Sequence, residues 1–331
     1  MTEVRLMVVG VGGMGRHHIG NTLEVEDARI TALVDPSIGS LAAAKERFPA
    51  LAEIPSFENI TDALNSHLAD GAIIVTPHSQ HFEHGMACLN AGLHVMMEKP
   101  LVAGSEQARR IIAQAQRVGR HLAVGYQRHT EGTYLYVRQL VQSGALGDIQ
   151  FVTAYLAQSW LQITRGTWRQ NPELSAGGQL NDSGSHMVDA VLWITGLEPE
   201  EVWASIDNCG TQVDINSAIT VRFRGGALGT FNIVGNSTVG WWDELTIHGS
   251  KGTALFRNGK LLLALGSGPG SVPAEVPVSE LPPGSNPAKN FVDLIQGRVA
   301  HPAAPAEYGL RVAKFTEAAW KSASLRQPVR L

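Results

Sequence analysis

Several features that would assign this chain to a class of protein are scarce or absent. Its 331 residues include only two cysteines, Cys88 and Cys209, too few for a disulfide framework or a four-cysteine zinc site. No apolar run approaches the roughly 18 residues of a membrane span, and the first run is too short for a signal peptide. The formal net charge of −4 lacks the basic excess of a nucleic-acid binder. We therefore expect a cytoplasmic protein that uses no membrane, nucleic acid or metal ion.

Charged residues and tryptophan are also scarce, each in an informative way. Charged residues make up 17% of the chain, below the roughly 25% of typical soluble domains, which suggests that a partner chain covers part of the surface. Tryptophan is absent from the first half. All seven lie in the second half: Trp160, Trp168, Trp193, Trp203, Trp241, Trp242 and Trp320. At roughly 150 residues per domain the length predicts two domains, and the asymmetry predicts that they differ in task.

Short apolar runs alternate with helical stretches through the N-terminal part of the chain. The expected strands are Val4–Val9, Ile30–Val34, Ile54–Phe57, Ala72–Val75, His94–Met97 and Leu122–Val124. The expected helices are Met14–Leu23, Leu41–Phe48, Ile60–Leu68, Phe82–Ala91 and Glu106–Val118. This alternation implies right-handed crossovers and a parallel sheet. Six such strands predict a doubly wound dinucleotide-binding domain of the α/β class.

A glycine-rich motif stands where that fold binds phosphate. Gly10-Val11-Gly12-Gly13-Met14-Gly15 closes the first expected strand and opens the first helix. Gly10 permits the tight turn, Gly12 lets a pyrophosphate approach the backbone, and Gly15 allows close packing of helix and strand. The helix N-terminus offers amide groups and a partial positive charge to the phosphates.

Asp35 supports the same interpretation. It ends the second expected strand, 20 residues after Gly15, where a carboxylate binds the adenosine ribose hydroxyls and repels a 2′-phosphate. No arginine follows closely after Asp35-Pro36-Ser37, so NAD is favoured over NADP. The alternative is a purely structural glycine turn with a capping aspartate.

Glu98-Lys99-Pro100 follows the fifth expected strand, at the carboxyl edge where doubly wound sheets bind their ligands. A lysine there lies beside the nicotinamide and donates a hydrogen bond to a substrate oxygen. The alternative is a solvated lysine at a strand end, the usual place for this residue.

Histidines recur every three residues after the fourth expected strand, which ends before Thr76-Pro77. They are His78, His81 and His84, with Cys88 four positions further on. On a helix this spacing turns by about 60° per step, so the whole set cannot converge on one ion. His81 either contacts the cofactor or is solvated like its neighbours.

The stretch Gly177–Asp189 is the second candidate for chemistry. Asp182, His186 and Asp189 are spaced by four and three residues, which on a helix places them on one face. Histidine titrates near neutrality and accepts the proton lost when an alcohol is oxidised, while a carboxylate orients its ring. The alternative is a capping aspartate with a buried core histidine.

Aromatic residues in the second half suggest a sugar pocket. Trp168 and Arg169 lie just upstream of the glycines, where they could stack on a pyranose or cyclitol ring and bind its hydroxyls. The alternative is a tryptophan buried under a loop with solvated arginines. No dense acidic or basic cluster indicates a strongly charged substrate. Three tryptophans are expected in the core, Trp193, Trp203 and Trp320, while Trp241-Trp242 fits either an interface or a pocket wall.

These residues together resemble the Gfo/Idh/MocA family of NAD(P)-dependent sugar and inositol oxidoreductases. The resemblance covers nearly the whole chain and is most specific in the ordered pair Glu98-Lys99-Pro100 and Gly177–Asp189. It implies a Rossmann domain over residues 1–126. For residues 127–331 it implies an α/β domain with a large, open, mostly antiparallel sheet that pairs subunits into homodimers or homotetramers. Hairpin signals at Gly225-Gly226 and Asn258-Gly259 agree with such a sheet.

The resemblance also implies roles for individual residues. His186 is the general base, Lys99 the hydrogen-bonding electrophile, and Asp182 the group that orients His186. The implied cofactor contacts are Gly10, Gly12, Gly13, Met14, Gly15, Asp35, Thr76, Pro77, His81, Glu98, Lys99 and Gln127. The implied substrate contacts are Lys99, Arg128, Trp168, Arg169, Asp182 and His186. His129 and Gln179 depart from the family's usual arginine and glycine.

The expected activity is hydride transfer between NAD and a secondary alcohol or ketone of a sugar, anhydrosugar or inositol. One alternative keeps the fold and cleaves glycosidic bonds through transient oxidation, with no net turnover of NAD. Another is a non-catalytic ligand sensor, against which the retained Lys99 and His186 argue.

Overall fold

The computed structural model describes residues 3–266 and 270–331, and their contacts divide the chain into two compact units. The first unit runs to Thr130 and includes Ser285–Leu310. The second unit comprises Glu131–Gly284 and Arg311–Leu331. The sequence prediction assigned everything after residue 126 to one domain. In the structure the chain instead returns to the first unit, because Phe291 and Val292 complete the core beneath its sheet.

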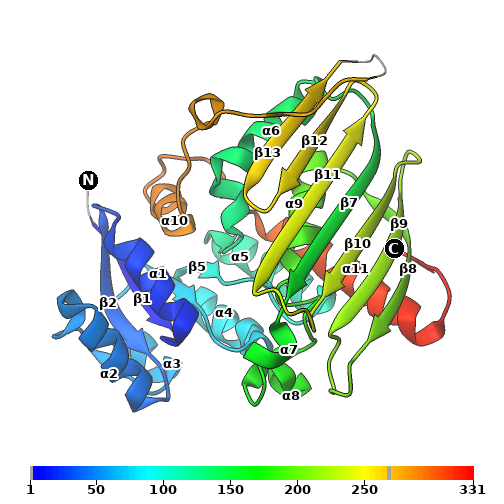
Figure 1. Cartoon of the computed structure of the whole chain (residues 1–331). Coiled ribbons are helices and arrows are strands. Elements are labelled where there is room, and N and C mark those ends of the chain that lie inside the picture. The colour runs from blue at the N-terminus through cyan, green and yellow to red at the C-terminus, as the bar shows by residue number, and fades with distance from the viewer. Residues whose placement is uncertain (1–2, 267–269) are drawn as a thin grey trace. The chain divides into compact units, whose positions relative to one another are not determined.

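Six parallel strands form sheet A of the first unit in the order β3-β2-β1-β4-β5-β6, as a doubly wound fold requires (Figure 1). The strands are β1 (Val4–Val9), β2 (Ala28–Val34), β3 (Ser56–Phe57), β4 (Gly71–Ile74), β5 (His94–Met97) and β6 (Leu122–Val124). Both faces of β1 are buried. Leu6 packs with Ile73 and Met96, whereas Val8 packs with Ile19 of the first helix. Continuous apolar sequence therefore forms these strands.

The helices of the first unit begin and end at recognisable signals. They are α1 (Gly13–Leu23), α2 (Ile38–Arg47), α3 (Ile60–Asn65), α4 (His81–Asn90), α5 (Ser105–Val118) and α10 (Pro287–Ile295). Ser37 caps α2 by accepting a hydrogen bond from the Ser40 amide, and Asn286 caps α10 in the same way. Gly119 ends α5 in the left-handed conformation.

Nine strands form sheet B of the second unit, in the order β14-β13-β12-β11-β7-β10-β9-β8-β15. They are β7 (Ile149–Gln158), β8 (Pro199–Asp207), β9 (Asn216–Phe223), β10 (Leu228–Val234), β11 (Trp241–Gly249), β12 (Gly252–Arg257), β13 (Lys260–Leu265), β14 (Ala274–Glu275) and β15 (Val329–Arg330). Among the described pairs only β7 and β10 run parallel. The mostly antiparallel sheet is confirmed, and so are the hairpins at residues 225–226 and 258–259.

One face of sheet B is covered by helices. The helices of this unit are α6 (Gly132–Gln142), α7 (Trp160–Ile163), α8 (Pro172–Ser175), α9 (Ser185–Thr195) and α11 (Ala306–Leu325), which starts in the first unit. On the covered face Val152 and Leu156 are buried, and Phe231 meets Phe315 of α11 at 4.9 Å between ring centroids. Tyr155 lies on the opposite face and is exposed.

The tryptophans divide differently from the prediction. Trp193 is buried in α9, as expected. Trp203 is 45% exposed, so its assignment to the core was wrong. It alternates on β8 with the buried Val202 and Ala204, which places its ring on the uncovered face. Trp320 is half-buried. No helix in the described part of the chain is long and apolar enough to cross a membrane.

Candidate active site

The glycine-rich turn has the shape that a bound pyrophosphate needs. Gly10 has a φ of +88°, and a Cβ there would lie 2.6 Å from the carbonyl oxygen of Val75. A Cβ on Gly12 or Gly13 would meet nothing within 4 Å, so the backbone is open to a ligand. Helix α1 starts here with neither a capping side chain nor an acidic residue in its first turn. The turn therefore fits a dinucleotide phosphate, which would be held by the free amides.

Asp35 is fixed at the end of β2 by two backbone hydrogen bonds. Its Oδ2 accepts from the Val11 amide at 2.9 Å, and its Oδ1 accepts from the Ser37 amide at 2.8 Å. The first bond ties the carboxylate to the glycine-rich turn. Each oxygen retains a lone pair for a hydroxyl, so the group suits the ribose of a dinucleotide.

His81 connects two loops at the carboxyl edge of sheet A. Its Nε2 lies 2.9 Å from the carbonyl oxygen of Thr76, and its Nδ1 lies 2.8 Å from that of Pro100. The ring is buried, and burial lowers its pKa. His81 therefore holds the segment after Lys99 against the segment after β4, a positioning role that the spacing did not predict. The neighbouring His84 places its Nδ1 3.1 Å from the Thr76 hydroxyl. No group of metal-ligating side chains occurs in residues 3–266 and 270–331.

Glu98 and His18 form a buried pair beneath Lys99. The Oε1 of Glu98 lies 3.2 Å from the Nε2 of His18, and both side chains are less than 10% exposed. Burial alone would raise the pKa of Glu98, but the hydrogen bond from His18 and the nearby charge of Lys99 outweigh it, so that the pKa lies below its usual value. The sequence prediction gave His18 no role. Its position one turn after the glycines, facing the sheet, was the available signal.

Gln127 and Arg128 follow β6 in a short 3-10 turn that ends at Thr130. Gln127 is exposed, whereas Arg128 is 5% exposed. Lys99 is half-buried in the same unit.

In the second unit, a buried carboxylate organises the loop before α9. Asp214 accepts hydrogen bonds from the Gly178 amide at 2.9 Å, the Leu180 amide at 2.7 Å and the indole of Trp320 at 2.9 Å. A Cβ on Gly178 would lie 2.0 Å from the carbonyl oxygen of Asp214, so only glycine fits this approach. Burial raises the pKa of Asp214 against the opposing effect of these bonds. Sequence analysis missed this residue, which lies more than 30 positions from its partners.

Asp182 follows in the same loop and is itself held from two sides. Its Oδ2 accepts from the indole of Trp160 at 2.9 Å and from the Nε of Arg169 at 3.0 Å. The guanidinium of Arg169 also lies over the Trp168 ring, 4.5 Å from the centroid. Asp182 precedes the helix, since α9 begins at Ser185, and the prediction that it shares a helical face with His186 is corrected.

His186 stands out within its own helix. Helix α9 is almost entirely buried, and only His186 and Thr195 retain intermediate exposure. Asp189, which the spacing grouped with His186, is fully buried. The helix therefore presents one titratable side chain that is partly accessible. Lys99 belongs to the first unit and His186 to the second, and each is described within its own unit.

Comparison with known families agrees with the two-unit division. Residues 4–126 match the model of an oxidoreductase family with an NAD-binding Rossmann fold. Residues 134–255 match the model of the GFO/IDH/MocA C-terminal domain. Together the two models cover more than half of the chain.

Individual relatives and structures are similar to the chain. An inositol 2-dehydrogenase from Leifsonia xyli is 31% identical over 248 residues, which are 67% of this chain and 68% of that protein. A scyllo-inositol 2-dehydrogenase (NADP(+)) from Bacillus subtilis is 30% identical over 61% of this chain and 54% of its own. The chain spans little more than half the length of several such curated relatives. A solved oxidoreductase domain protein from Kribbella flavida has the same fold, with a TM-score of 0.89 at 23% identity over 100% of this chain and 99% of that chain.

Proposed function

Because the chain belongs to the Gfo/Idh/MocA family of oxidoreductases, we propose that it transfers a hydride between a nicotinamide dinucleotide and a secondary alcohol or ketone of a sugar, anhydrosugar or inositol. The observation that carries the proposal is the half-buried His186 on the otherwise buried helix α9. The loop before it is held by Asp214 and contains Asp182. A polar, preorganised group of this kind supports proton transfer to or from a hydroxyl.

The first unit is the family's NAD-binding Rossmann domain. We propose NAD rather than NADP because the Asp35 carboxylate is fixed by Val11 and Ser37 where a 2′-phosphate would be repelled. The similar Bacillus subtilis protein carries NADP(+) in its name, so the preference of this chain requires its own measurement.

The proposed roles of the catalytic side chains follow from their chemistry. When bound, the dinucleotide supplies the hydride acceptor. His186 accepts the hydroxyl proton of the substrate, and Lys99 donates a hydrogen bond to the same oxygen. Glu98, kept ionised by His18, lies next to Lys99 in the chain and attracts its ammonium group. Asp182 holds Arg169 and Trp160 in place and contributes negative charge before α9.

The substrate class is the less determined part of the proposal. Trp168 and Arg169 are half-buried and stacked on one another, which offers a planar surface and hydrogen-bond donors to a polyol ring. Arg128 is buried in the first unit and is proposed as a further contact.

The test is a panel of inositols, aldoses and anhydrosugars assayed with NAD and NADP at 340 nm. Net NADH formation with one polyol class supports the dehydrogenase. Release of an aglycone from a glycoside without net reduction of NAD would replace it with the glycosidase, and binding without either reaction would indicate a sensor.

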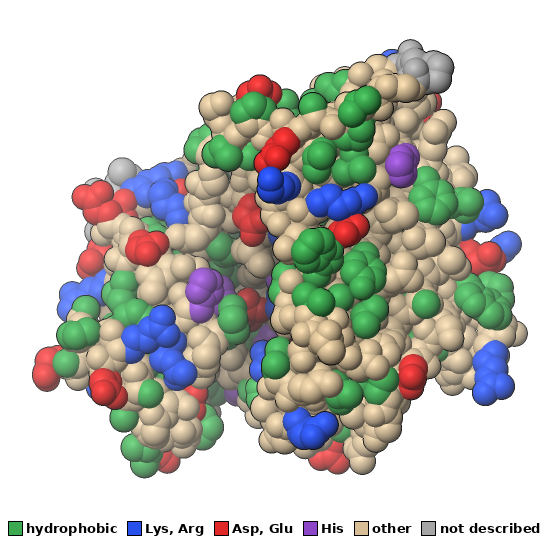
Figure 2. Space-filling view, in the orientation of Figure 1, with side chains coloured by type: hydrophobic (Ala, Val, Ile, Leu, Met, Phe, Trp, Pro, Cys, Tyr) green, Lys and Arg blue, Asp and Glu red, His purple; other side chains and the backbone are tan. Residues whose placement is uncertain are grey.

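We further propose that two copies of the chain associate through the uncovered face of sheet B. Large side chains gather over these strands in Figure 2. They are between 37% and 45% exposed: Tyr155, Trp203, Leu228, Trp241 and Trp242. A contiguous apolar surface of this kind is typical of interfaces. Light scattering should give a mass of at least two chains. Trp203→Glu should lower that mass, and a monomeric wild type would refute the assignment.

The proposed compartment is the cytoplasm. The two thiols are free, and burial raises the pKa of Cys88 to about 12, so that neither requires an oxidising environment.

A further inference from the structure

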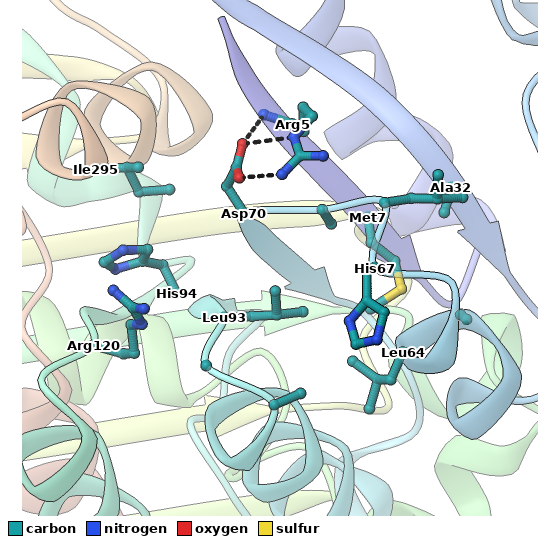
Figure 3. A pocket seen from close by; sticks show the side chains of 15 residues that line it. Arg5, Met7, Ala32, Leu64, His67, Asp70, Leu93, His94, Arg120 and Ile295 are labelled. Atoms are coloured by element: carbon teal, nitrogen blue, oxygen red, sulfur yellow. Dashed lines mark hydrogen bonds and ion pairs between the residues drawn. The ribbon is translucent and has the colours of Figure 1, made fainter. Parts of the chain in front are cut away.

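A cavity of about 440 Å³ lies at the amino ends of β1, β4 and β5 (Figure 3). Its polar lining comprises Arg5, His67, Asp70, His94 and Arg120. The glycine-rich turn follows the carboxyl end of β1, and at about 3.3 Å per residue it is roughly 16 Å along the strand from Arg5. The cavity is therefore separate from the dinucleotide site, and its volume falls in the range that small ligands occupy.

The floor of the cavity is apolar. Met7, Ala63 and Leu93 are each less than 10% exposed, and Leu64 and Leu68 complete the surface around them. Figure 3 shows Leu93 between the side chain of His94 on one side and that of His67 on the other. An apolar floor with a few polar groups at its edge is the usual composition of a binding pocket.

The charges on the lining are not balanced. Asp70 is the sole carboxylate on it, and Arg5 occupies both of its oxygens, at 2.6 Å from Nη2 to Oδ1 and 3.1 Å from Nε to Oδ2. This pairing holds the pKa of Asp70 below its usual value. No hydrogen bond or ion pair joins the Arg120 guanidinium to any residue that the structure describes. One positive charge is therefore left over in a chain whose net charge is −4.

His94 adds an oriented donor beside Arg120. Its Nδ1 accepts a hydrogen bond from the His121 amide at 3.0 Å, and its ring stacks on that of His121 with 4.8 Å between centroids. Burial, His121 and Arg120 lower the pKa of His94 to about 4, against the effect of Asp70, so the ring is neutral at pH 7. Because Nδ1 accepts, the single ring proton must be on Nε2, which is then a hydrogen-bond donor.

We propose that this cavity binds a small organic anion, with its carboxylate or phosphate group on Arg120 and the Nε2–H of His94, and its apolar body on Met7 and Leu93. The donors offered are a guanidinium and a neutral imidazole, which suit an anionic oxygen acceptor. The site does not depend on the proposed oxidoreductase activity, since its lining lies wholly at the opposite end of sheet A from Asp35 and the glycines.

The test is calorimetric titration of the intact protein, saturated with NAD so that the glycine-rich turn is occupied. Phenyl phosphate and benzoate are the probes, with inorganic phosphate and phenol as the separate charged and apolar parts. Both probes should bind saturably and more tightly than either part alone. Arg120→Gln should weaken binding about 10- to 150-fold, the usual effect of losing one charge-assisted bond. Arg120→Lys should retain part of the affinity.

The matched control is Arg117→Gln, since Arg117 is an exposed arginine near Arg120 whose Nε donates to Gln114 outside the cavity. It should bind as the wild type does. Nuclear magnetic resonance of the histidine rings gives the location: the resonances of His94 and His121 should move on titration, and the pKa of His94 should rise when an anion is bound. The proposal is overturned by an absence of saturable binding, by equal affinities of the Arg120→Gln and Arg117→Gln variants, or by unmoved His94 and His121 resonances.

Discussion

Asp214→Asn tests how the loop before α9 is held. In the wild type the Oδ2 of Asp214 accepts from the Leu180 amide at 2.7 Å, while Oδ1 serves Gly178 and Trp320. Asparagine keeps one oxygen, so its NH₂ group faces the Leu180 amide as a second donor. Losing a bond to a charged acceptor costs about 1.5–3 kcal/mol, and a buried unsatisfied donor costs about 1–3 kcal/mol more. Relief of the buried charge, which raises the pKa of Asp214, offsets part of this. We expect a net loss of about 2–4 kcal/mol in the free energy of unfolding of the second unit.

The assay follows from the distribution of tryptophan. All seven tryptophans belong to the second unit, so their fluorescence during urea unfolding reports on that unit alone. The control is Asp207→Asn, an exposed carboxylate in the same unit that bonds the Cys209 amide. Turnover of the Asp214→Asn variant should also fall while NAD affinity, a property of the first unit, stays unchanged. Equal unfolding midpoints for the two variants would refute the reasoning.

Three further predictions concern the proposed chemistry. His186→Ala should lower kcat by roughly 10² to 10⁴ with NAD affinity retained, and full turnover in the steady-state assay would remove His186 from the mechanism. Asp35→Ala should weaken NAD and narrow the preference over NADP, as measured by fluorescence titration of the reduced cofactors; an unchanged ratio would contradict the ribose assignment. The pKa of Glu98 is lowered in the folded state, so its stabilising contribution is present above the unfolded value near 4.5 and disappears as pH falls through the folded value. The difference in unfolding free energy between wild type and Glu98→Gln, followed by circular dichroism, should therefore shrink on acidification, whereas a constant difference would contradict the pair with His18.

Local sequence predicted the strands of both sheets well, for a physical reason. Buried parallel strands such as β1 require continuous apolar runs, and hairpins such as that at Asn258-Gly259 require residues that tolerate positive φ. Both signals are contained in a few neighbouring residues. The same holds for the glycine-rich turn and Asp35, whose spacing along the chain is set by one strand-helix-strand unit.

The parts that were missed depend on contacts between distant residues. His18 pairs with Glu98 across 80 positions, and Asp214 bonds Leu180 across 34. A lone histidine or aspartate shows no pattern until its partner is placed. Trp203 was misjudged because its size suggested the core, while the period of two along β8 determined its face. The start of α9 was misplaced because Asp182, a good helix-capping residue, lies in the preceding turn instead.

The return of residues 285–310 to the first unit has a consequence for synthesis on the ribosome. The core beneath sheet A contains Leu6, Ile73 and Met96 together with Phe291 and Val292 of α10. At about 5–20 residues per second, the ribosome takes roughly 10–30 s to reach α10 after finishing β6. During that interval the nascent sheet exposes apolar side chains that nothing yet covers. We expect ribosome-bound chains that stop after β6 to be sensitive to protease and to bind chaperones, and chains that extend past α10 to be protected.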